Sequence, residues 1–134
     1  MKVSYTFPKS QRLTSKIEID AVYNQGQTLK KYPLIVKYLT QAEMEKECLK
    51  ALFAVPKRRI SKAVKRNRIK RMLKEVYRLN KHQLELDLKE NNQKMALFFV
   101  YTGKENIAYA ILEEKIRLIL KELSGIVNDA SNRH

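Results

Sequence analysis

One stretch of the chain, residues 57–74, limits the possible folds and partners more than any other. Apolar residues recur within and just after it at the spacing of a helix with one buried face, namely Ile69, Met72, Leu73, Val76 and Tyr77. We therefore expect a helix from Ser61 to about Leu79. The same stretch carries ten basic residues and no acidic one: Lys57, Arg58, Arg59, Lys62, Lys65, Arg66, Arg68, Lys70, Arg71 and Lys74.

The sign of this charge indicates an anionic partner rather than an ordinary solvated helix face. A solvated face usually mixes signs, with Glu placed one turn before Lys. Here the first acid is Glu75, and cations occupy the first helical turns, where the helix dipole disfavours them. A bound phosphate would reverse that penalty. We interpret all ten basic residues as a binding site for backbone phosphates. Asn67 could donate to RNA or make a hydrogen bond at the helix start.

Length and composition restrict the class of protein. The chain has 134 residues, a net charge of +14 and 44% hydrophobic residues, which favours one folded domain over residues 1–134 and excludes a disordered basic tail. We expect a core over about 7–124 and a flexible tail over 125–134. A lone cysteine, Cys48, favours the reducing cytoplasm. The chain begins without the apolar core of a signal peptide and has no membrane-length apolar run.

Hydrophobic patterning predicts the other elements. Ser15 and Glu18 form a candidate capping box for a helix that buries Ile17 and Ala21 and ends at Gly26. Four strands are predicted: Gln27–Lys31, Leu34–Leu39, Leu49–Val55 and Met95–Tyr101. A last amphipathic helix, with apolar residues including Ala108 and Ile111, ends at Gly125. Residues 41–46 are predicted to be a turn or a short loop, and 81–93 fit a frayed helix or a loop. The fold class is α+β, with helices packed on a mixed sheet.

Aromatic side chains matter because unpaired bases stack on them. Phe53, Phe98 and Phe99 lie in apolar runs and are assigned to the core. Tyr23 and Tyr38 fit either the core or a base-stacking surface.

The residue types that protein nucleases use for catalysis are sparse. His82 and His134 have no catalytic partner nearby in the sequence, and the acidic residues of segment 43–47 are typical of a solvated turn. Cys48, at a strand entrance, is expected to be a small buried hydrophobe. The sequence thus favours binding over catalysis by the protein itself.

Several segments resemble the bacterial ribonuclease P protein component family. Segment 63–75, with Arg66-Asn67-Arg68 near its centre, resembles the family's "RNR" signature. Segment 7–13 resembles its amino-terminal K-x-x-R-L entry, Gly26 stands where a glycine follows the first helix, and Val55-Pro56-Lys57-Arg58 resembles its V-S-K-K strand exit. The resemblance covers about Phe7 to Leu123.

The resemblance implies a fold and an activity. The fold would be α-β-β-β-α-β-α with a left-handed βαβ crossover, against the usual right-handed preference. The activity would be endonucleolytic removal of the 5′ leader from precursor tRNA by a cytoplasmic ribonucleoprotein. Its RNA subunit would carry the chemistry with Mg²⁺ ions that the RNA mainly holds.

The resemblance also implies roles for single residues. Arg66, Asn67, Arg68, Lys70 and Arg71 match the RNR motif and would contact the catalytic RNA. A cleft between the sheet and the first helix would bind the single-stranded leader, lined by Arg12, Ile19, Tyr23 and Lys37. No side chain of the chain is expected to be catalytic or to bind a metal.

The expected partners are therefore the catalytic RNA and precursor tRNA, with neither DNA nor a membrane. A membrane-binding role for the basic helix is disfavoured because its apolar face is committed to a core. A non-catalytic RNA-binding module, such as a ribosomal or assembly protein, is the alternative that the same basic helix allows.

Overall fold

The computed structural model describes residues 5–41 and 47–131. After a short 3₁₀ turn, Lys9–Gln11, its elements follow in the order α1 (Lys16–Gln25), β1 (Gln27–Lys31), β2 (Leu34–Gln41), β3 (Leu49–Ala54), α2 (Ala63–Asn80), α3 (His82–Glu90), β4 (Lys94–Tyr101) and α4 (Tyr109–Ser131).

The four strands form one mixed sheet in the order β1-β2-β4-β3. β4 pairs antiparallel with β2 and parallel with β3. A parallel pair of strands needs a long crossover connection, which α2 and α3 supply between β3 and β4. The predicted α+β class with a mixed sheet is confirmed.

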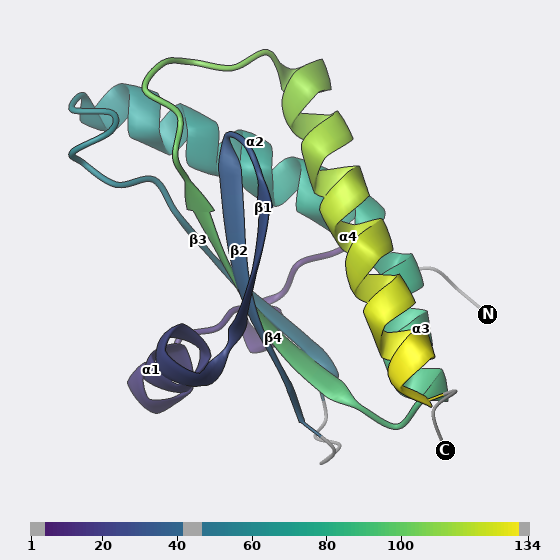
Figure 1. Cartoon of the computed structure of the whole chain (residues 1–134). Helices are drawn as coiled ribbons and strands as arrows, with labels where there is room; N and C mark the ends of the chain where they lie inside the picture. Colours follow the sequence, from purple (N-terminus) through teal and green to yellow (C-terminus); the bar gives the residue numbers. More distant parts are fainter. Residues whose placement is uncertain (1–4, 42–46, 132–134) are drawn as a thin grey trace.

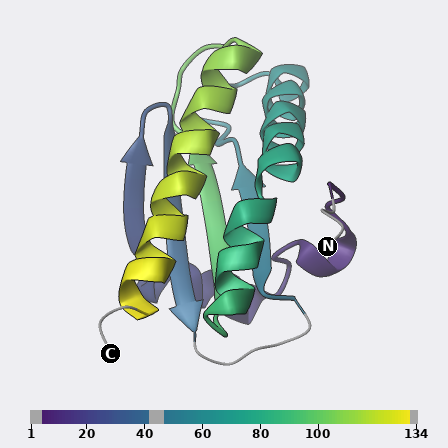
Figure 2. The ribbon, with the colours of Figure 1, turned by 90° about the vertical axis from the view of Figure 1, so that its right-hand side faces the viewer.

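The sheet has helices on both faces (Figures 1 and 2). α2, α3 and α4 cover one face, while α1 alone lies against the other. The main core lies under the three helices and includes Leu97 and Phe99 of β4. Side chains alternate across a strand, so Phe98 points to the α1 side, where it is half-buried. The assignment of Phe98 to the core is therefore wrong, whereas Phe53, Phe99 and Tyr38 do belong to it.

The predicted ends of α1 are confirmed. The Ser15 hydroxyl accepts a hydrogen bond from the backbone N–H of Glu18 at 3.4 Å. The helix ends at Gly26, where a Cβ atom would lie 2.3 Å from the Val22 carbonyl oxygen and 2.8 Å from that of Tyr38 on β2. Only glycine allows α1 to approach the sheet this closely.

The structure resolves the open choice between helix and loop for one segment and corrects the end of another helix. Residues 82–90 form α3, in which Leu84 and Leu88 are buried one turn apart. The predicted stop at Gly125 is wrong, because α4 continues to Ser131 and buries Val127. Residues 125–131 are accordingly helix and not a flexible tail. None of the helices in the described segments is long and apolar enough to cross a membrane.

Candidate RNA-binding surfaces

Most of the predicted phosphate-binding residues are exposed on α2 and on the loop that precedes it. We call the loop 56–62 and the solvent side of α2 the basic face. Its exposed members are Lys57, Arg58, Lys62, Lys65, Asn67, Arg68, Arg71 and Lys74, and its half-buried members are Arg59, Arg66 and Lys70. The opposite side of α2 buries Ile69, Leu73, Val76 and Tyr77 in the core, as the periodicity predicts.

Arg66 is placed differently from its neighbours in the RNR motif. Its Nη1 atom donates to the carbonyl oxygens of Ile60 at 2.9 Å and Ser61 at 2.6 Å. These bonds tie the first turns of α2 to the preceding loop. Arg66 therefore shapes the basic face, while Arg68 and Arg71 present their guanidinium groups to solvent.

Arg78 continues the line of Asn67, Arg71 and Lys74 along α2 but is bound within the protein. It forms an ion pair with Glu75 at 2.6 Å, and its Nη1 donates to the Tyr5 carbonyl oxygen at 2.7 Å. The hydrogen bond to Glu75 raises the pKa of Arg78. This arginine fastens the amino-terminal segment to α2 and ends the basic face.

The start of α2 faces a second segment that sequence patterning did not reveal. The loop between β4 and α4 brings Lys104 beside Arg58 and Arg59. Between this loop and the start of α2 lies a hollow of about 460 Å³ lined by Arg59, Lys62 and Lys65. Lys104 is some forty residues from the basic loop in sequence, so local charge counting could not find it.

The predicted leader cleft lies on the other face of the sheet. Tyr23 on α1 fits either the core or the surface by sequence, and at 58% exposed it lies on the surface. Lys37 on β2 places its Nζ atom 4.3 Å from the centre of the Tyr23 ring and donates to the Tyr23 carbonyl oxygen at 3.2 Å. This cation–π contact and hydrogen bond fix a ring and a positive charge side by side.

Strand register extends the cleft across the sheet. Lys37 pairs with Phe98 on β4, and Phe98 pairs with Leu52 on β3. All three side chains are half-buried on the α1 side. A lysine, an aromatic ring and an aliphatic side chain thus form one row, a combination suited to a phosphate and an unpaired base.

The remaining predicted cleft residues border this row. Ile19 lies one turn before Tyr23 on α1 and is half-buried. Arg12 is exposed and lies beside β3, where its backbone forms an isolated β-bridge with Ala51. Its guanidinium carbon lies 5.5 Å from the centre of the Phe7 ring, and no contact joins it to Tyr23 in the described segments. The structure therefore groups Ile19, Tyr23 and Lys37 and places Arg12 at the β3 edge.

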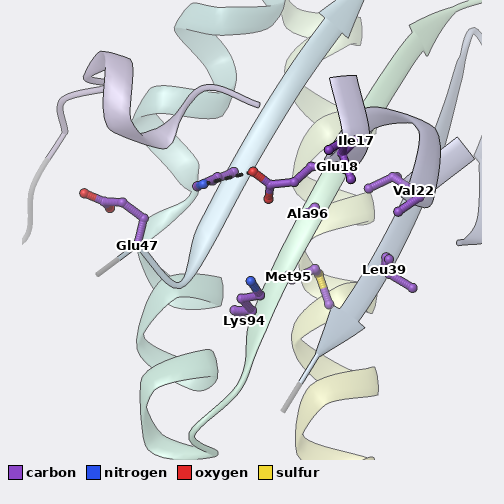
Figure 3. Close-up of a pocket in the computed structure, with 10 residues that line it drawn as sticks. Ile17, Glu18, Val22, Leu39, Glu47, Lys94, Met95 and Ala96 are labelled. Atoms are coloured by element: carbon purple, nitrogen blue, oxygen red, sulfur yellow. Dashed lines mark hydrogen bonds and ion pairs between the residues drawn. The ribbon is translucent and has the colours of Figure 1, made fainter. Parts of the chain in front are cut away.

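A hollow of about 290 Å³ opens between α1 and the strands (Figure 3). Ile17 and Val22 of α1 face Leu39 and Ala96 of the sheet across it, and Lys50 forms an ion pair with Glu18 at 3.3 Å beside it. Ile17 is 83% exposed, so its predicted burial is wrong. Helical periodicity alone cannot separate an isoleucine that lines a surface hollow from a core residue.

Among the residues that the structure describes, those considered for catalysis do not form a constellation. Within segments 5–41 and 47–131, no three His, Cys, Asp or Glu side chains converge as metal ligands would. His82 packs its ring edge-on against Tyr5. Cys48 is buried, as predicted, and burial raises the pKa of its thiol. His134 and two of the acids of segment 43–47 lie outside the described residues.

Comparisons with known proteins agree with the family resemblance. The family model described as Ribonuclease P matches residues 7–124. The ribonuclease P protein component of Porphyromonas gingivalis is 34% identical over 92% of this chain and 90% of its own length. That of Chlorobaculum tepidum is 28% identical over 91% of this chain and 85% of its own.

Solved structures agree at the level of the fold. The ribonuclease P protein of Staphylococcus aureus has a TM-score of 0.65 at 16% identity, covering 85% of this chain and 95% of that protein. That of Thermotoga maritima has a TM-score of 0.62 at 19% identity, covering 83% and 96%. With a family model spanning most of the sequence and curated relatives matched along almost their whole length, the chain belongs to the ribonuclease P protein component family.

Proposed function

We propose that this chain is the protein subunit of ribonuclease P and assists removal of the 5′ leader from precursor tRNA. In this proposal the basic face binds the catalytic RNA, and the cleft under α1 binds the single-stranded leader. The observation that carries it is that two surfaces of different chemistry lie on different sides of one sheet. One surface is rich in exposed cations and the other combines Tyr23, Lys37 and Phe98.

The chemistry of the basic face supports binding to a folded RNA. Its seven exposed lysines and arginines contain no intervening acid, so each is available to a phosphate. Arginine forks grip phosphate oxygens bidentately and lysines add point charge. Fixed positive charge also replaces part of the cation atmosphere that compact RNA requires.

The cleft supports recognition of an unpaired strand. A base can stack on the Tyr23 or Phe98 ring, while the Lys37 ammonium group beside Tyr23 can meet a leader phosphate. A duplex presents no free base faces, so this arrangement favours the leader over the paired stem. Arg12 would contact the leader from the β3 edge.

We assign no bond-breaking step to this chain. Its described carboxylates and histidines do not converge, so its donor set does not fit a metal cage of its own. When bound, Mg²⁺ would supply charge stabilisation at the scissile phosphate. We place those ions mainly on the RNA subunit and the assembly in the cytoplasm.

The experiment that tests this proposal compares affinities for two RNAs at physiological salt. The chain is expected to bind ribonuclease P RNA at least about tenfold more tightly than a ribosomal RNA fragment of equal length. Equal affinities for the two RNAs would contradict the proposal and favour a general RNA-binding module.

A further inference from the structure

A hollow lined partly by tyrosines, which we call the aromatic hollow, lies at the end of the sheet away from α1. The tip of the β1–β2 hairpin, the end of β4 and the start of α4 meet there (Figure 1). The hollow measures about 470 Å³ and is lined by Tyr32, Pro33, Lys104, Ile107, Ile111 and Lys115, among others. Neither the predicted leader cleft nor the RNR motif includes any of these residues.

Large apolar side chains are left open to solvent at this hollow. Tyr32 is 72% exposed and Ile111 is 48% exposed. Ile111 belongs to the predicted apolar residues of α4, yet it lines the hollow. A flat ring beside an aliphatic surface is the arrangement on which a base can stack.

Hydrogen bonds and close packing hold the wall of the hollow in place. The Tyr101 hydroxyl donates to the Glu105 carbonyl oxygen at 2.5 Å, and the Thr102 N–H donates to the Pro33 carbonyl oxygen at 2.7 Å. A Cβ atom on Gly103 would lie 2.6 Å from the Tyr101 hydroxyl oxygen. The loop 102–106 is therefore packed against the hairpin, which makes the hollow a preformed feature.

The charge around the hollow favours an anionic ligand. Lys104 and Lys115 line it together with one acid, Glu105. Lys104 also lines the neighbouring hollow at the start of α2, where Arg59, Lys62 and Lys65 add three further cations. The aromatic hollow and the basic face are thus contiguous through the loop 104–106.

We infer that this hollow binds one unpaired nucleotide of the catalytic RNA, with its base against Tyr32 and Ile111 and its phosphate at Lys104. This inference rests on the proposed function. We choose the catalytic RNA as the source because this hollow shares Lys104, Glu105 and Asn106 with the hollow at the start of α2, beside the basic face. If an RNA duplex binds on α2, an unpaired nucleotide next to that duplex could reach the hollow while the duplex stays bound.

The test measures affinity of the full chain for ribonuclease P RNA with Tyr32→Ala, Tyr32→Phe and Tyr109→Ala. Tyr109 is an exposed tyrosine on α4 outside the hollow and serves as the matched control. Loss of one stacked base should weaken binding by about 5- to 20-fold in Tyr32→Ala. Tyr32→Phe and Tyr109→Ala should stay within about twofold of the original chain.

Chemical probing of base faces provides a second readout. One unpaired nucleotide should be protected in complexes with the original chain and with Tyr32→Phe, and should become reactive with Tyr32→Ala while the rest of the footprint is unchanged. Unchanged affinity and protection in Tyr32→Ala would overturn the inference and leave the proposed function intact. Failure of the original chain to bind the RNA would instead contradict the proposed function.

Two further outcomes would also overturn the inference by identifying another occupant. If Tyr32→Ala lowers holoenzyme affinity only for leader-bearing precursor tRNA, the hollow binds substrate. If the original chain self-associates in sedimentation and Tyr32→Ala abolishes this without affecting RNA affinity, a second copy of the chain occupies it.

Discussion

Arginines of one helix have different roles here, and only their partners distinguish them. Arg66 binds two loop carbonyls and Arg78 binds Glu75 and the amino-terminal segment. Arg68 and Arg71 are exposed. Helical spacing places Arg78 on the same side of α2 as Arg71, so spacing alone cannot separate their roles. The structure leaves Arg68 and Arg71 as the better candidates for phosphate contacts.

Replacing both Arg68 and Arg71 with Ala is expected to weaken binding to the catalytic RNA and to make that binding less dependent on salt. Each lost phosphate contact should reduce the slope of log affinity against log salt concentration by roughly one unit. Filter binding across a salt series measures this slope.

The matched control replaces Lys89 on α3 and Lys121 on α4 with Ala. Both lysines are exposed and lie outside the basic face. Their replacement removes two positive charges, as the Arg68→Ala, Arg71→Ala variant does. Its slope should remain close to that of the original chain. Equal slopes for the two double variants would show that only total charge matters.

Tyr23→Ala is expected to reduce the affinity of the holoenzyme for leader-bearing precursor by about 5-fold or more, the effect of losing one stacked base. Mature tRNA lacks the leader and should bind as before. Tyr23→Phe keeps the ring, so the holoenzyme should keep most of its higher affinity for precursor over mature tRNA. Equal losses for precursor and mature tRNA in Tyr23→Ala would contradict a role in leader binding.

Elements with strong local signals could be predicted from the sequence. The capping residues of α1, the apolar stripe of α2 and the β-branched run of β2 each specify a structure within a few residues. α3 gave no clear signal because Leu84, Leu86 and Leu88 alternate, which hides the helical pair Leu84 and Leu88. Lys81, just before α3, is buried and forms an ion pair with Glu85 at 2.8 Å. A buried lysine is not expected from the polar sequence of this segment.

Tertiary packing explains why α4 is longer than predicted. Gly125 in a helix costs about 1 kcal/mol relative to alanine. The next turn buries Val127 and half-buries Ile126 against the core. Burial of such a side chain contributes about 1.5–3 kcal/mol, which exceeds the cost of the glycine. The glycine is visible in the sequence as a helix-stop signal, but the free energy gained by burying the next turn is not.

The two helix-associated glycines are expected to respond in opposite directions to substitution by Ala. Gly26→Ala would place its Cβ against two backbone carbonyls and should lower the free energy of unfolding by about 1–3 kcal/mol. Gly125→Ala meets no atom within 4 Å and should raise it by about 0.5–1 kcal/mol. Urea denaturation of the two variants measures both changes, and a shift of the same sign in both would contradict the structure.

Across the whole molecule, the basic face was easier to predict than the clefts. Its cations are contiguous in sequence and their sign is visible without a fold. The predicted leader cleft combines α1 with three strands, and the aromatic hollow combines the β1–β2 hairpin with the β4–α4 loop. Phe98, Ile17 and Lys104 acquire their surroundings only when these segments meet, so no local pattern reveals them.

A net charge of +14 on one small domain implies strong self-repulsion. Anions that bind the folded basic face should therefore stabilise the protein. About 10 mM sulfate is expected to raise the melting temperature more than sodium chloride of equal ionic strength, by roughly 3–6 °C for each kcal/mol of stabilisation. Calorimetry measures the shift, and identical shifts in the two salts would argue against specific anion sites.

The most direct test of the division of labour between protein and RNA is precursor tRNA cleavage at a Mg²⁺ concentration at which ribonuclease P RNA alone is nearly inactive. Adding the chain should restore accurate removal of the 5′ leader, and the Arg68→Ala, Arg71→Ala double variant should restore less of it. An unchanged cleavage rate on adding the chain, or cleavage by the chain without any RNA subunit, would contradict the account.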